Sequence, residues 1–386
     1  MATPSVYSMR LVDSPRALSE AASELSGSPR LFIDTEFEST RESRTLCLLQ
    51  VSNGGTVFLI DTLRIANVTA LEPVFSDPNT EWVLHAGQQD VLLLLERLKL
   101  KQTPPIFDTQ IAWGLLGAEP SVSLAYLQFK LLGLRAGKAH QADDWKRRPL
   151  PESQLTYAAG DIEHLPELRR VLGGRLRAKH REQIAIDAAR DALVPSDDPP
   201  AELSLDSFRN AWQLDPASQA ALRALMDWYN GLSAHKRAAA PAPKTLLAIA
   251  SRLPEDGQDV VRIKGVPMAW GRRYGDQLAA LVVRAVHSAR SGDFVPIDPP
   301  PYATFEEIRL DAYFSTLRAE VCAKLEAAPE LAMPARVLRR LRHSLLEGGV
   351  DHALQAVDGW RADLCRDAIC SHMQTLPPPL APQTKR

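Results

Sequence analysis

The first ~195 residues combine short apolar runs with longer stretches of helical spacing. Apolar runs of strand length, bounded by turn-forming residues, recur five times, and Asn53 and Gly54 between two of them favour a hairpin. The predicted strands cover residues 31–37, 46–52, 56–61, 82–86 and 106–108. Apolar positions three and four apart predict helices over 88–98, from 109, and from 151 onward. This pattern is typical of a mixed α/β domain.

Strand signals fade after residue 195. The segment 194–200 is rich in Pro and Asp, and the segment 293–301 is rich in Pro, so both are predicted linkers. Residues 207–233, 276–289 and 305–373 have helical spacing, and the proline-rich end is typical of a disordered tail. We therefore expect the first domain to fold on its own, with helical domains after it. The expected divisions are 1–195, 202–292, 302–375 and the tail 376–386.

Composition narrows the class of protein. Hydrophobic residues make up 45% of the chain and charged residues 24%, which is typical of soluble globular proteins. No apolar stretch reaches bilayer length and no signal peptide is recognisable, so a cytoplasmic location is expected. The cysteines form no CxxC pair, which favours reduced thiols over zinc ligands or disulfides. A net charge of −2 argues mildly against a nucleic-acid partner, although phosphate contacts need only a local basic patch.

A pair of acids stands at the end of the first predicted strand. Side chains alternate along a strand, so Asp34 and Glu36 point to the same face. Two neighbouring carboxylates repel each other, and a cation between them removes that cost. Hard oxygen ligands suit Mg²⁺ or Mn²⁺. Taken alone, the pair could equally be two solvated acids.

Two further positions add to this pair. Asp90 falls in the first turn of a predicted helix, just after a strand and a glycine turn, where an acid also suits the helix dipole. Tyr157 and Asp161 are four residues apart on a predicted helix, so they share a face. Each feature alone has an ordinary structural explanation, namely a helix-end acid or a packed tyrosine beside a surface acid.

Together these residues resemble the three exonuclease motifs of the DEDD superfamily, in the branch marked by a tyrosine. The surrounding residues resemble the ribonuclease D family in particular, over about residues 28–175. The similar segments are 33–37, 46–50, 85–87, 108–110, 144–145 and 148–150. Gln89 departs from the family, which often has an acid at that place.

The resemblance continues less sharply into the second half. Residues 210–214 and 246–254, with Trp228, are similar to a helicase-and-RNase-D C-terminal (HRDC) domain, and residues 302–373 to a degenerate second copy. The segment 238–243 departs from the family's more polar loop. The implied fold is an RNase H-like core, an α/β domain with helices on both faces of a mixed five-stranded sheet, followed by all-α HRDC-type domains. Three antiparallel strands and then two parallel ones are expected in the sheet.

The resemblance also implies a chemistry. Two divalent cations, Mg²⁺ or Mn²⁺, would be held by Asp34, Glu36, Asp90 and Asp161. Asp34 would bridge both ions, and Tyr157 would orient the attacking water. The implied activity is 3′→5′ exoribonuclease hydrolysis of RNA with a free single-stranded 3′ end, releasing nucleoside 5′-monophosphates, with tRNA precursors as the first expectation.

Three questions stay open at this level. A basic segment before the third motif is either an RNA-positioning patch or a solvated loop with its tryptophan packed inward. Its residues are Lys138, Trp145, Lys146, Arg147 and Arg148. A DNA exonuclease of the same superfamily and a catalytically silent RNA-binding scaffold are the alternative functions. The helical domains could bind RNA or serve only in packing.

Overall fold

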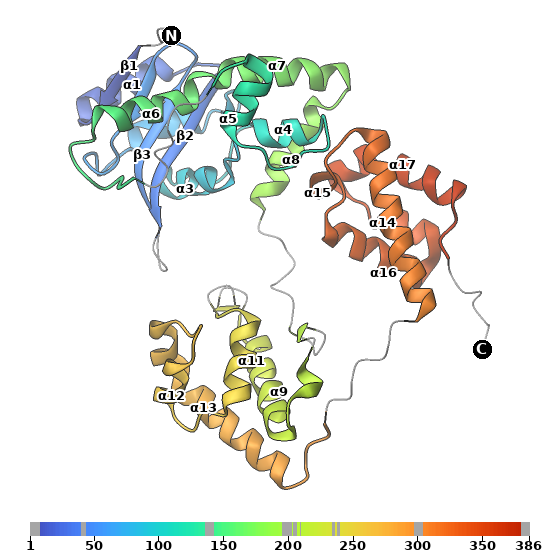
Figure 1. Cartoon of the computed structure of the whole chain (residues 1–386). Helices are drawn as coiled ribbons and strands as arrows, with labels where there is room; N and C mark the ends of the chain where they lie inside the picture. Colours follow the sequence, from blue (N-terminus) through green and yellow to red (C-terminus); the bar gives the residue numbers. More distant parts are fainter. Residues whose placement is uncertain are drawn as a thin grey trace. The chain divides into compact units, whose positions relative to one another are not determined.

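The computed structural model describes residues 8–39, 44–135, 143–194, 203, 207–208, 210–233, 236–237, 240–296 and 304–379. The chain forms two compact units (Figure 1). Unit 1 comprises Met1–Pro195 together with Phe305–Arg386, and unit 2 comprises Ser196–Thr304. Among the helices in the described ranges, none has the length and apolar character needed to cross a membrane.

A six-stranded mixed sheet forms the centre of unit 1, in the order β1-β4-β3-β2-β5-β6. The strands are β1 (Met9–Val12), β2 (Arg30–Ser39), β3 (Arg44–Ser52), β4 (Val57–Ile60), β5 (Glu81–Leu84) and β6 (Ile106–Asp108). Strands β2, β3 and β4 are antiparallel, and β5 and β6 continue parallel to β2. The predicted mixed core is therefore confirmed.

The predicted count of five strands was one too low. The additional strand, β1, pairs parallel with β4 at the edge of the sheet. It has only four residues, and three of them are exposed although Met9 and Leu11 are apolar, so no pattern of strand length distinguishes it. Such a short edge strand is defined by its pairing partner, which sequence spacing does not reveal.

Helices cover both faces of the sheet. On one face, Phe32 and Leu48 pack with residues of α6 (Glu152–Glu163) and α7 (Leu165–Ala178). On the other, Ile33 and Leu49 pack with residues of α1 (Pro15–Leu25) and α3 (Gln88–Leu98). Burial on both faces explains why β3 reads as an almost continuous apolar run.

Four helices from the end of the chain belong to the same unit. They are α14 (Phe305–Leu325), α15 (Pro329–Ala332), α16 (Ala335–Gln355) and α17 (Gly359–Thr375). Their apolar side chains join the core cluster that contains α6 and α7. The amide of Ala328 donates to the Gly114 carbonyl (2.7 Å). Asp191 on α8 (Glu182–Leu193) accepts hydrogen bonds from Trp360 Nε1 (3.2 Å) and Arg361 Nη1 (2.7 Å).

This shared core changes the expectation for the first 195 residues. The proline-rich linker predicted that they fold on their own, whereas unit 1 also buries apolar side chains of residues 305–379 against them. A linker marks a break between elements that are consecutive in sequence. It says nothing about a later segment that returns to the same core.

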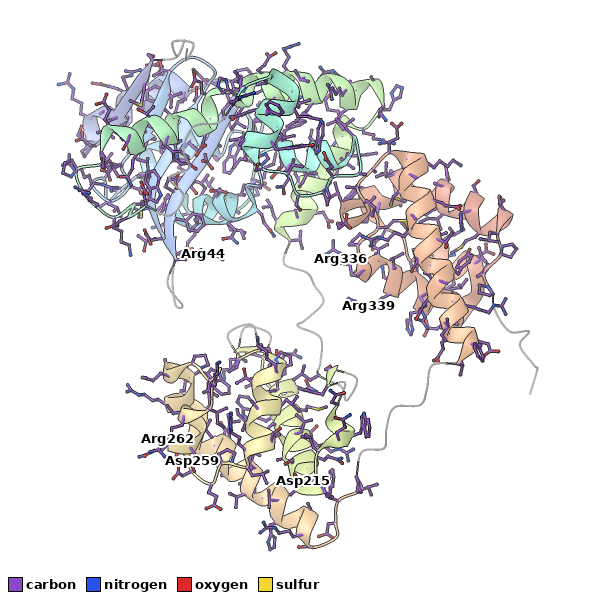
Figure 2. The ribbon with its side chains drawn as sticks, in the orientation of Figure 1. Arg44, Asp215, Asp259, Arg262, Arg336 and Arg339 are labelled. Atoms are coloured by element: carbon purple, nitrogen blue, oxygen red, sulfur yellow. The ribbon has the colours of Figure 1, made fainter. Side chains whose placement is uncertain are left out.

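Unit 2 has its own apolar core and is helical, in keeping with an HRDC-type domain. Its main helices are α9 (Pro216–Asn230), α11 (Pro243–Arg252), α12 (Gly257–Arg262) and α13 (Met268–Arg290). Asp215, which Figure 2 labels in this unit, caps α9. It accepts hydrogen bonds from the amides of Ala217 and Ser218, both at 3.0 Å. Most of the tail predicted at 376–386 lies outside the described residues, because the description ends at residue 379.

Candidate active site

Three carboxylates meet between the sheet and α6. Asp34 and Glu36 are two residues apart on β2, so both point toward the face that α6 covers. Asp161 lies near the end of α6. One carboxylate oxygen from each of the three residues lies within 4.8 Å of the others. This places side chains from two distant segments around one point.

Burial makes this cluster electrostatically costly without a cation. Desolvation, and then the charges of Asp90, Asp161 and Glu36, raise the pKa of Asp34 well above its usual range. Desolvation and the charge of Asp161 raise the pKa of Glu36 to about 8. The pKa of Asp161 is raised to about 6 by desolvation. An all-oxygen donor set with this spacing fits a hard divalent cation, whose charge would favour the ionised carboxylates.

Asp90 stands beside this group rather than within it. It lies in the first turn of α3 and is 9% exposed. Its Oδ1 accepts a hydrogen bond from the hydroxyl of Thr35, whose side chain points to the opposite face of β2 from Asp34. Asp90 is nevertheless close enough to be the largest charge contribution to the raised pKa of Asp34. A second cation bound next to Asp34 would therefore find Asp90 already oriented.

Sequence reasoning missed Thr35. In the pattern Asp-Thr-Glu it is the middle residue and faces the apolar side, so it reads as an ordinary core position. A buried hydroxyl next to two functional acids is a weak signal, because threonine is common in strands. Only the packing of α3 against that side of β2 gives the hydroxyl its partner.

The turn before α3 is held by one buried carboxylate. Asp108 accepts from the amides of Ala86 (3.1 Å) and Gly87 (2.9 Å). Ala86 adopts a positive φ of 54°, and a Cβ at position 87 would lie 2.7 Å from atoms of Leu84. Position 87 therefore requires glycine. The turn that precedes Asp90 is held by the hydrogen bonds to Asp108 and by its close packing on Leu84.

Tyr157 lies one helical turn before Asp161 on α6 and is half-buried. The two side chains are hydrogen bonded, which partly offsets the upward pKa shift of Asp161. Desolvation, then the charges of Asp161 and Glu36, raise the pKa of the phenol above its usual range. The phenol therefore stays protonated at neutral pH, where it can donate a hydrogen bond but cannot act as an anionic base.

Two members of the predicted RNA-binding segment face inward. Trp145 is 2% exposed and packs near Tyr157, with ring centroids 6.3 Å apart. Arg148 makes two hydrogen bonds to Asp61 (2.6 and 2.8 Å) and one to the Cys47 carbonyl (2.9 Å). The buried Trp145 ring has no exposed face on which a base could stack. The Arg148 guanidinium already makes its hydrogen bonds within the protein. For these two residues the structure favours the packing interpretation.

The other three residues of that segment keep their predicted role as a hypothesis. Lys146 and Arg147 are exposed. Lys138 lies outside the described residues. An acid that the sequence did not single out, Asp143, borders the site, since its charge contributes to the raised pKa of Glu36. Asp143 accepts a hydrogen bond from Gln154 Nε2 of α6 (3.3 Å).

The structural role of Arg148 can be tested against its neighbour. We expect Arg148→Met to lower the free energy of unfolding by about 3 kcal/mol, because it leaves the buried Asp61 carboxylate without its cationic partner. Urea denaturation measures this change, and the exposed Arg147→Met is the matched control with unchanged stability. If Arg148→Met is as stable as the wild type but binds RNA more weakly, Arg148 contacts RNA.

The acids of the site lie within a region that matches known exonucleases. A family model described as 3′-5′ exonuclease matches residues 9–177. The ribonuclease D of Pseudomonas paraeruginosa is 28% identical over 369 residues, covering 93% of this chain and 96% of that protein. The ribonuclease D of Granulibacter bethesdensis is 29% identical over 373 residues, covering 92% and 90%.

A solved structure shows the same fold. The crystal structure of Escherichia coli RNase D, described as an exoribonuclease involved in structured RNA processing, superposes with a TM-score of 0.68. It is 24% identical and is matched over 96% of this chain and 99% of that one. With the exonuclease model matched over the sheet and its acids, and curated relatives matched along almost their whole length, the chain contains a 3′-5′ exonuclease domain and is similar throughout to ribonuclease D.

Proposed function

We propose that this chain is a 3′–5′ exoribonuclease of the ribonuclease D family and hydrolyses RNA with two divalent cations held by Asp34, Glu36, Asp90 and Asp161. The observation that carries the proposal is the convergence of Asp34, Glu36 and Asp161 to within 4.8 Å under the helix that bears Tyr157. The family depends on divalent metal ions, and this oxygen-only cluster suits Mg²⁺ or Mn²⁺.

Each acid has a distinct place in this scheme. Asp34 has neighbours on both sides, with Glu36 and Asp161 in its own cluster and Asp90 beyond it, so it is the residue that both ions would share. Asp90 would serve the second ion, and the Thr35 hydroxyl keeps its carboxylate in place. When bound, two such ions stabilise charge on the attacking and leaving oxygens and lower the pKa of bound water.

Tyr157 is the proposed orienting group for the attacking water. Its phenol stays protonated and donates its single O–H to the Asp161 carboxylate, so its oxygen can accept a hydrogen bond from the water but does not remove a proton. Its position on α6 is supported by Trp145 beneath it. The expected products are nucleoside 5′-monophosphates released one at a time from the 3′ end.

The proposed substrate is RNA with a free single-stranded 3′ end, with tRNA precursors as the first candidate. The Escherichia coli relative is described as acting in structured RNA processing, which supports this choice. Lys146 and Arg147 are exposed just before α6 and can contact phosphates near the acids. A local patch of this kind suffices for an acidic protein, because phosphate contacts depend on the surface charge near the RNA.

Matched oligonucleotides test this proposal against its alternatives. We expect Mn²⁺-dependent release of mononucleotides from a single-stranded RNA and from a tRNA with extra 3′ nucleotides, and much slower release from a DNA of the same sequence. A 3′-phosphate should block the reaction, and EDTA serves as the metal-free control. Preference for DNA would favour a DNA exonuclease, whereas RNA binding without hydrolysis would favour a silent scaffold.

A further inference from the structure

One buried side chain beside the acids has no ordinary structural explanation. Gln50 lies on β3 and is 0% exposed. Within the described part of the chain, neither its amide nitrogen nor its amide oxygen has a hydrogen-bond partner. Buried polar atoms are nearly always paired, because they lose their hydrogen bonds to water on folding. An apolar side chain of similar size at this position would avoid that cost.

A second buried glutamine shows how such an amide is normally accommodated. Gln219 on α9 is 3% exposed. Its Nε2 donates to the carbonyls of Trp212 (3.1 Å) and Leu214 (2.9 Å), which lie just before the helix. Gln219 thus stabilises the chain entry into α9, whereas Gln50 makes no comparable bond within the described part of the chain.

The register of the sheet places Gln50 directly against the metal site. Gln50 is the cross-strand partner of Asp34 in the β2–β3 ladder. Directly opposed residues point to the same face, with Cβ atoms about 4.5–5.5 Å apart. The amide of a glutamine extends beyond its Cβ by two further carbons, so it can reach the Asp34 carboxylate. α6, which carries Asp161, packs over both strands.

We propose that Gln50 is a positioning residue of the metal site, whose amide Nε2–H donates to the Asp34 carboxylate when cations are bound there. The inference rests on the proposed function. Carboxylates that ligate metals are usually held by hydrogen bonds from residues behind them, and removing such a partner weakens metal binding. Asp34 is the acid for which orientation matters most, because both ions would share it. The amide, which has no partner among the described residues, would then find its acceptor at the metal site.

A buried water is the competing explanation. Trp145 Nε1 and Gln154 Oε1, on the same side of the sheet, are also buried without partners among the described residues. A water joining these atoms to Gln50 would make the amide part of the folded structure itself. The two explanations predict opposite effects on the stability of the metal-free protein, which makes them separable.

Gln50→Met tests the proposal in the full-length protein, with Gln50→Leu as a second apolar replacement. We expect the thermal midpoint of the metal-free protein to stay equal or rise, because the unpaired amide is gone. Mn²⁺ affinity, measured by calorimetry without RNA, should fall by about 10- to 100-fold. The matched control is Gln219→Met, which removes two hydrogen bonds and should lower the midpoint without changing Mn²⁺ affinity.

The outcomes separate this inference from the function on which it rests. Unchanged Mn²⁺ affinity in both Gln50 variants overturns it, as does a lowered midpoint in the metal-free protein, which would indicate the buried water. Asp34→Asn is measured alongside. If Asp34→Asn binds Mn²⁺ like the wild type, the proposed metal site itself fails. If Asp34→Asn loses binding while the Gln50 variants keep it, only the role of Gln50 fails.

Discussion

Asp34→Asn is expected to reduce RNA hydrolysis by more than about 10³-fold while the protein stays folded. Loss of a single electrostatic contact in an active site commonly costs ~10²–10³-fold in turnover, and Asp34 is proposed to hold both cations. The carboxylate is half-buried among three other acids, so its removal relieves repulsion in the metal-free protein. The thermal midpoint without metal should therefore be no lower than that of the wild type.

Single-turnover hydrolysis of a labelled RNA at saturating Mg²⁺ measures this effect. Asp13→Asn is a suitable control, because Asp13 is a partly exposed acid of the same unit that pairs with Arg64 and not with the acids of β2 and α6. The control should hydrolyse RNA at the wild-type rate. Near-normal turnover by Asp34→Asn would refute the metal assignment, whatever its stability.

Tyr157→Phe should lower kcat by ~10²–10⁴-fold, the range for a lost group that handles or orients a proton. The ring and its packing on Trp145 are kept, so only the phenol hydrogen bond is removed. Mn²⁺ affinity should fall little, because a neutral phenol is a much weaker ligand for a hard cation than the carboxylates beside it. The expected signature is a large loss of turnover with metal binding retained, the reverse of the pattern expected for Gln50→Met.

A second tyrosine supplies the comparison. Tyr126 is hydrogen bonded through its phenol to Glu119 (2.8 Å) at the surface of the same unit. Tyr126→Phe therefore removes a hydroxyl–carboxylate bond without touching the acids of β2. Both variants are assayed for RNA hydrolysis and for Mn²⁺ binding by calorimetry. A wild-type rate for Tyr157→Phe at neutral pH would assign Tyr157 to packing.

Local sequence patterns predicted most of the elements of the α/β core and the residues of the proposed site. Apolar runs located the strands of the sheet centre, and β6 and α3 have the predicted limits. Alternation along a strand placed Asp34 and Glu36 on one face, and helical spacing placed Tyr157 beside Asp161. These are local consequences of backbone geometry, so they need no knowledge of what packs against each element. The family motifs then connected the local features to one reaction.

Which of these elements contact one another is known only from the tertiary structure. In the folded chain Asp161 lies beside the acids of β2, more than a hundred residues away in sequence. Thr35 donates a hydrogen bond to Asp90, and Arg148 donates to Asp61. Residues 305–379 also pack onto the α/β core beyond a linker. The physical reason is that periodicity records whether a position is buried, not which distant residue buries it. For the same reason Gln50 reads as an ordinary strand residue until the register sets it opposite Asp34.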